Sequence, residues 1–271
     1  MRKKLLPVLL TLALAVALLT VGALADASDN VIYVNANDTT ADTETGVGTA
    51  SNPYNSLDAA VDKAPDGSVI EILSDVTTDG LELRKDLTIR GGMVAEGTEK
   101  YTIKFVEYGI ALWGKSLTFE NCNVEMDGIG STPYTAEWDW MTICASAGAS
   151  MTLNNVNMTM DAEGTTNSPH AIYFCNDNVL NIENGSVLEI KNYPNDALEW
   201  DGGNGGYNVN ITDSTFISDH NRSGFTGTFY ATITDSKVNV INSTGNGSNG
   251  TNFIIRTTAD ALATPTTDDN T

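Results

Sequence analysis

The chain has 271 residues, with 14 Lys and Arg against 35 Asp and Glu, which gives a formal charge of −21. Such an acidic surface repels nucleic-acid phosphates and anionic lipid head groups, so binding to nucleic acid and direct binding to membranes are disfavoured. It also repels polyanionic substrates such as pectate unless a divalent cation bridges the two. The length suffices for one large domain with its own core.

The first 25 residues are predicted to be a signal peptide. Arg2, Lys3 and Lys4 precede an apolar run over 5–19, and residues 23–25 (Ala-Leu-Ala) supply a cleavage site. An uncleaved membrane anchor is the alternative, but the apolar run is near the lower limit for crossing a bilayer. Cleavage removes three cations and no acid, which moves the formal charge from −21 to −24. No later segment is apolar enough to enter a membrane, so the mature protein is expected outside the cytoplasm.

The predicted elements of the mature chain begin with a strand at 31–34. Segment 56–64 (SLDAAVDKA) has one apolar face, which predicts a short helix capped by Asn55 or Ser56. Such a helix would cover the open end of a first coil, where unpaired strand edges invite aggregation. Residues 65–67 (Pro-Asp-Gly) then turn the chain into the repeating region.

Internal repetition is the strongest signal in the sequence. Six short segments alternate apolar and polar residues and end at a turn residue. Their central apolar residues follow one another at steps of 30, 34, 29, 29 and 22 positions: Ile89, Phe119, Leu153, Ile182, Ile211 and Ile233. A second series precedes most of them, as in HAIYF from His170 and DALEW from Asp196. A third series follows, as in VLEI at 187–190.

Each period thus holds about three short strands joined by Asn, Asp and Gly turns. A period that varies in its turns and not in its strands is typical of a solenoid, whereas a β-sandwich needs longer strands and closer hairpin signals. We therefore predict an all-β protein, a right-handed parallel β-helix of about six to seven coils over residues 26–256, with strands stacked at ~4.8 Å. Residues 257–271, rich in Thr and Asp, are interpreted as a tail or linker.

The run IYVNAND…NPYNSLDAAVDKAPDGSVIEILSDV, followed by KDLTIRGG, resembles the opening of pectin-lyase-like β-helix proteins. It is especially similar to adhesin-like members that are secreted by, or attached to the cell surface of, Gram-positive bacteria. The resemblance covers residues 32 to about 256 and implies the fold. The resemblance does not specify a function, because lyases, hydrolases, epimerases and non-catalytic adhesins all share this fold. Wall-attached relatives continue into an LPxTG signal, so the chain is expected to be either freely secreted or part of a longer wall-anchored protein.

Three cysteines, Cys122, Cys144 and Cys175, match no zinc or redox spacing. Buried thiols acting as small apolar residues are the preferred interpretation. A bridge between Cys144 and Cys175, which fall in successive repeats, is the alternative.

The sequence does not match the catalytic motifs of the enzymes with this fold. Polygalacturonase-like hydrolysis needs close carboxylates from adjacent coils, but Asp196, Glu199 and Asp201 lie in one segment, and the Gly-His-Gly and Arg-Ile-Lys motifs are missing. Asp219, His220 and Arg222 (in ISDHNR) resemble an Asp-His element of one lyase family. The accompanying Arg-x-Pro-x-x-Arg is missing, so Arg222 is a weak candidate for a catalytic base.

His170 and Asp196 are a second weak catalytic pair. Each precedes the Ala of an equivalent strand, so the two side chains are expected to stack ~5 Å apart on one outer face. They are interpreted either as an acid–base dyad or as a polar contact between neighbouring coils.

Aromatic residues give the better signal for ligand binding. Three of them crowd the longest inserted segment beside an acid, and two more flank a Gly-rich loop; the candidate ligand-binding residues are Tyr134, Trp138, Asp139, Trp140, Trp200 and Tyr207. Aromatic rings beside Asp and Asn suit the faces and hydroxyls of sugars. The alternative is that Trp140 and Trp200 fold inward or cover loop edges.

No cofactor is expected beyond a weak Ca²⁺ site of oxygen ligands at Asp196, Glu199 and Asp201. The sequence favours a non-catalytic secreted or cell-surface protein, adhesin-like or glycan-binding. Two alternatives stay open. One is a polysaccharide lyase or glycoside hydrolase acting on a uronate-containing polysaccharide, and the other is a structural stalk segment of a larger adhesin.

Overall fold

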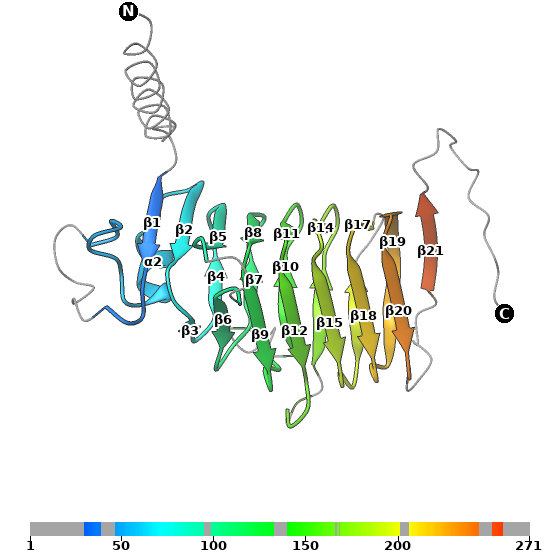
Figure 1. Cartoon of the computed structure of the whole chain (residues 1–271). Coiled ribbons are helices and arrows are strands. Elements are labelled where there is room, and N and C mark those ends of the chain that lie inside the picture. Colours follow the sequence, from blue (N-terminus) through cyan, green and yellow to red (C-terminus); the bar gives the residue numbers. More distant parts are fainter. Residues whose placement is uncertain are drawn as a thin grey trace, which may run out of the picture. The chain divides into compact units, whose positions relative to one another are not determined.

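A computed structural model describes residues 30–38, 47–94, 99–132, 140–165, 167, 169–200 and 206–243, together with the backbone of 251–256. The predicted signal peptide and the predicted tail at 257–271 lie outside the described residues. From residue 31 onward the chain forms one unit of stacked coils (Figure 1). The described residues form no helix long and apolar enough to span a membrane.

From β2 onward the coils contribute strands to three faces of the solenoid. The first face contains β1 (Val31–Val34), β2 (Ser68–Ile72), β5 (Leu87–Gly91), β8 (Ser116–Glu120), β11 (Ser150–Asn154), β14 (Val179–Glu183), β17 (Tyr207–Thr212) and β21 (Thr251–Arg256). The second face contains β3 (Val76–Thr78), β6 (Thr102–Phe105), β9 (Asn123–Asp127), β12 (Asn157–Asp161), β15 (Val187–Lys191), β18 (Thr215–Asp219) and β20 (Lys237–Ile241). The third face contains β4 (Leu81–Leu83), β7 (Ile110–Leu112), β10 (Met141–Ala145), β13 (His170–Phe174) and β16 (Asp196–Trp200).

All these strands pair in parallel with their equivalents one coil away, which confirms the predicted parallel β-helix. Leu153, for example, pairs with Phe119 of the preceding coil and with Ile182 of the next. The long strand β19 (Ser223–Thr234) joins two faces, because its first half pairs with β16 and its second half with β17. The third and first faces therefore form one continuous sheet, and the second face forms another.

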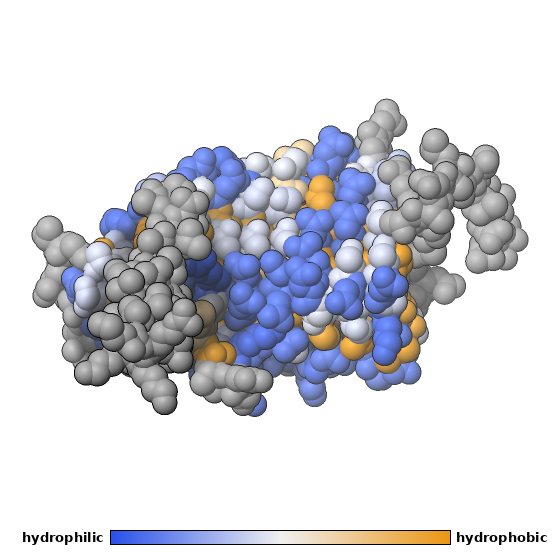
Figure 2. All heavy atoms as spheres, turned by 45° about the horizontal axis from the view of Figure 1, so that its top comes forward, coloured by the Kyte–Doolittle hydropathy of each residue, from blue (hydrophilic) through white to orange (hydrophobic). Residues whose placement is uncertain are grey.

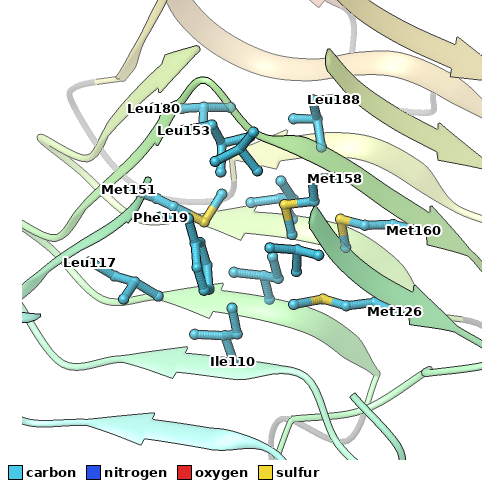
Figure 3. Close-up of a cluster of buried hydrophobic side chains, with 14 of the residues drawn as sticks. Ile110, Leu117, Phe119, Met126, Met151, Leu153, Met158, Met160, Leu180 and Leu188 are labelled. Atoms are coloured by element: carbon cyan, nitrogen blue, oxygen red, sulfur yellow. The ribbon is translucent and has the colours of Figure 1, made fainter. Parts of the chain in front are cut away.

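The interior is filled by the inward-facing residues of all three faces (Figure 3). Strands such as β11 and β14 alternate buried and half-buried positions, as a strand with one covered side must. Met126, Met158 and Met160 add flexible side chains from the second face to this core. On the face that Figure 2 shows, the described residues are mostly hydrophilic, with hydrophobic ones in small separate patches.

Asn and Asp side chains form the turns between the first and second faces. Asn121, Asn155, Asn184, Asp213 and Asp235 all have a positive φ, between 47° and 57°. Asn and Asp tolerate this left-handed conformation better than other residues with a side chain. The Asn155 amide also donates to Oδ1 of Asn121 one coil below, at 2.8 Å. The recurrent turn residues in the sequence are therefore explained by one backbone conformation.

The predicted N-terminal helix is confirmed as α2 (Leu57–Lys63). Ser56 is its N-cap and accepts a hydrogen bond from the backbone N–H of Ala59. The ammonium group of Lys85 donates to the backbone oxygens of Val61, Asp62 and Ala64, which satisfies carbonyls at the C-terminal end. The apolar side of the helix joins the core of the first coil.

Replacing Phe119 by Ala tests the core. The ring is fully buried, so we expect the free energy of unfolding in urea to fall by about 3–5 kcal/mol. The neighbouring Thr118 points outward on the same strand, and Thr118→Ala should change stability by about 0.5 kcal/mol or less. Equal losses in the two variants would contradict the assigned register.

Candidate functional site

Polar residues from three successive coils meet on the outer side of the third face. We call the set of His170, Asp196, Glu199, Arg222 and Ser223 the buried polar cluster. Ser223 pairs with Asp196 in the ladder, and the 26-residue offset between Ile172 and Leu198 aligns His170 with Asp196. In-register stacking therefore brings together residues that are far apart in the sequence.

Arg222 and Ser223 hold Asp196 in place. The guanidinium donates two hydrogen bonds to the Asp196 carboxylate, at 3.1 and 2.6 Å, and the Ser223 hydroxyl donates a third at 2.7 Å. Burial by itself raises the pKa of Asp196, which has no exposed surface. The hydrogen bonds from Arg222 and Ser223 and the charge of Arg222 outweigh this effect and lower the pKa below its ordinary value. The hydrogen bond to Asp196 raises the pKa of Arg222, so the guanidinium stays charged.

His170 and Glu199 face one another beside this ion pair. Nδ1 of His170 contacts Oε2 of Glu199 and lies 3.9 Å from Oδ2 of Asp196. Neither Nδ1 nor Oε2 is reached by solvent, and neither makes a well-formed hydrogen bond to another described residue. The ring of Trp140 stands edge-on to His170, with centroids 5.2 Å apart.

An apolar cluster outside the core lies next to these residues. Met141, Cys144 and Tyr173 are buried there, and Trp140 and Cys175 pack against them. Every residue of β10 and β13 is buried, so these two strands are covered on both sides. This explains why the segments MTICA and HAIYF are almost continuously apolar where strands of the first face alternate.

The structure brings some predicted catalytic residues together and separates others. His170 and Asp196 do lie on one outer face as predicted, but both are buried. Arg222 joins them, whereas His220 contacts Asp219: its Nδ1 is 2.7 Å from Oδ1 of Asp219, and its side chain is 56% exposed. The structure thus gives Arg222 and His220 different partners, because the guanidinium of Arg222 is held by Asp196.

Two of the three predicted metal ligands, Asp196 and Glu199, are adjacent, and Asp201 lies outside the described residues. The third side chain that the structure adds is His170, whose ligand atom lies within 4.8 Å of those of both carboxylates. Sequence reasoning also missed Ser223. Aligning SGFTG with DALEW would have found it, because the alignment places Ser223 one coil above Asp196.

The predicted aromatic binding residues lie in different environments. Tyr134, Trp138 and Asp139 lie outside the described residues. Tyr207 is a core residue with no exposed surface, stacked between Phe174 and Phe229 at 4.5 and 5.6 Å, so its predicted place on the surface is wrong.

The two remaining tryptophans lie on different sides of the sheet. Trp200 packs against the core and donates its indole N–H to Oδ1 of Asn176, in line with the alternative that it folds inward. Trp140 is half-buried on the outer face, edge-on to His170 and Tyr173.

Comparison with known proteins finds no matching family model, no matching curated protein and no matching solved structure.

The contribution of the Arg222–Asp196 ion pair to stability can be tested by Arg222→Ala. This change leaves the Asp196 carboxylate buried without its partner, so we expect the free energy of unfolding to fall by about 3–5 kcal/mol. Arg84→Ala is the control: Arg84 pairs with Glu82 and is 63% exposed, and its loss should cost about 1 kcal/mol or less. Equal effects in urea denaturation would show that the Asp196 pair contributes no more than a surface pair.

The cysteines give a second test. All three are thiols in the structure, and burial raises the pKa of Cys122 and Cys144 to about 12, whereas Cys175 is half-buried. Because the thiolate is the reactive form, iodoacetamide at pH 8 should modify Cys175 first and the other two only after unfolding. Mass spectrometry of the labelled peptides measures this order. Early modification of Cys144 would contradict its burial.

Proposed function

We propose that the protein is a secreted, non-catalytic β-helix of the pectin-lyase-like kind that binds glycans in an adhesin-like role. The observation that carries the proposal is the difference in exposure between the acid–base residues and the tryptophan on the third face. The residues capable of acid–base chemistry are buried and engaged with one another, while Trp140 beside them is half-buried and reaches the surface.

The burial of the carboxylates argues against glycoside hydrolysis at this site. A hydrolase presents one carboxylic acid to the leaving oxygen and one carboxylate to water or to the sugar. Asp196 is fully buried and Glu199 is 8% exposed, so neither is open to a polysaccharide chain. Arg222, the candidate base for lyase chemistry, is also engaged, because its guanidinium is held by Asp196.

Trp140 supports a binding role. A partly exposed indole offers a flat apolar surface to the face of a sugar ring. In the sequence it ends the inserted segment that also holds Tyr134, Trp138 and Asp139. Export is supported by the predicted signal peptide at 1–25.

The test is a glycan-array screen of the mature protein, followed by titration of the best glycan. Trp140→Ala should weaken binding by roughly 10-fold to 100-fold, the equivalent of losing ~1.5–3 kcal/mol of aromatic contact. Trp140→Phe, which retains a ring over His170, should lose less. The matched control is Trp113→Ala, since Trp113 is also half-buried but lies one coil earlier and directly after β7, where its indole N–H donates to Glu82. Unchanged affinity in Trp140→Ala, or no glycan bound at all, would overturn the proposal.

Cleavage of a uronate-containing polysaccharide is the second candidate function. The contact between Nδ1 of His170 and Oε2 of Glu199 favours it, because imidazole and carboxylate together can transfer a proton. Reducing-sugar and unsaturated-product assays on pectin and pectate separate the two functions. Product formation that disappears in Glu199→Gln would establish catalysis and refute a purely binding role.

A further inference from the structure

We propose that the imidazole of His170 and the carboxylates of Asp196 and Glu199 bind one divalent transition-metal ion, with Zn²⁺ as the representative. This goes beyond glycan binding and does not depend on it. It also replaces the all-oxygen Ca²⁺ site predicted from the sequence by a site with a nitrogen ligand.

The three ligand atoms are already gathered. Nδ1 of His170 and one oxygen of each carboxylate lie within 4.8 Å of one another, and Nδ1 is 3.9 Å from Oδ2 of Asp196. Zinc binds nitrogen and oxygen at about 2.0–2.2 Å, which places neighbouring ligand atoms roughly 3–4 Å apart. Rotation of the Glu199 side chain away from its contact with His170 is the adjustment that an ion at the centre requires.

Two buried atoms of the cluster that touch one another without forming a hydrogen bond are a second indication of a ligand. His170 is 7% exposed, and its Nδ1 and Oε2 of Glu199 are buried without a well-formed hydrogen bond. Buried polar groups almost always have a partner, because leaving one without a partner costs free energy of desolvation. A cation between the two atoms would satisfy both at once.

The net charge of the cluster also favours a bound cation. Two carboxylates lie at the site, and Arg222 is the one Lys or Arg that forms an ion pair with either of them among the described residues. A divalent ion offsets the excess of negative charge, as buried charges require.

Neighbouring groups hold the ligands in fixed positions. Arg222 and Ser223 fix the orientation of the Asp196 carboxylate, and Trp140 packs edge-on against the His170 ring. Such outer-shell contacts orient metal ligands and tune affinity. Three protein ligands leave a fourth position of a tetrahedral zinc site for water or a bound molecule.

The ligand set selects the class of metal. Imidazole suits Zn²⁺, Co²⁺ and similar ions, whereas Ca²⁺ and Mg²⁺ prefer oxygen ligands alone. We therefore expect Zn²⁺ and Co²⁺ to bind far more tightly than Ca²⁺.

The experiment is calorimetric titration of the chelator-treated mature protein with ZnCl₂, in parallel with thermal melting. One ion per chain and a melting temperature that rises with Zn²⁺ are expected for the wild type. His170→Ala and Glu199→Gln should each weaken binding by roughly 100-fold or more and abolish the Zn²⁺-dependent rise in melting temperature. Glu199→Gln keeps the shape of the side chain, so it remains informative if His170→Ala fails to fold.

His220→Ala is the matched control, because His220 is the second of the two histidines and also lies beside an acid, Asp219, but is exposed. It should bind as the wild type does. Cys175→Ser controls for binding through a thiol, and the Co²⁺ complex should lack the near-ultraviolet band of a cobalt–thiolate bond. The proposal is overturned if the wild type binds neither Zn²⁺ nor Co²⁺. It is also overturned if Ca²⁺ binds as tightly as Zn²⁺, or if His220→Ala or Cys175→Ser loses binding.

Discussion

In-register parallel pairing between strands one coil apart is the interaction on which the rest of the structure depends. It places equivalent residues of successive coils in columns at the strand spacing of ~4.8 Å. Inward columns such as Phe119, Leu153 and Ile182 form the core, and turn columns such as Asn121 and Asn155 share one backbone conformation. Strands must keep their length for this pairing to continue, so variation in the repeat is confined to the turns.

The same pairing determines how electrostatic repulsion between the acidic side chains is reduced. Like charges stacked in one column destabilise neighbouring strands, and opposite charges stabilise them. Arg90 lies between Glu71 and Glu120 in one column and binds Glu71 at 2.6 Å. Lys191 lies between Asp161 and Asp219 in another. These two cations thus lie within columns of acids, where each reduces repulsion on both sides.

On the third face, the stacking of equivalent residues in columns produces the buried polar cluster and not an exposed row of polar side chains. His170, Asp196 and Ser223 occupy one outward column, which on the other faces would meet solvent. Here Asp196 and Glu199 on β16 are buried, so their carboxylates must be paired or bound to a cation. Arg222 supplies the pairing for Asp196, and the metal ion that we propose would bind between His170 and Glu199 once the Glu199 side chain rotates.

The sequence alone determined the coil architecture, the capping helix and the stacking of His170 near Asp196. Apolar alternation, helix caps and repeat spacing are local signals, and parallel register converts spacing directly into neighbours. The sequence could not place Tyr207, which its Gly-rich flank suggested for a loop but which pairs with Phe229 and stacks inward. Nor could it predict that Arg222 binds Asp196 instead of acting with Asp219. Only the tertiary structure decided these points, because burial and pairing of an outward residue depend on the segments packed over it, and those segments do not repeat.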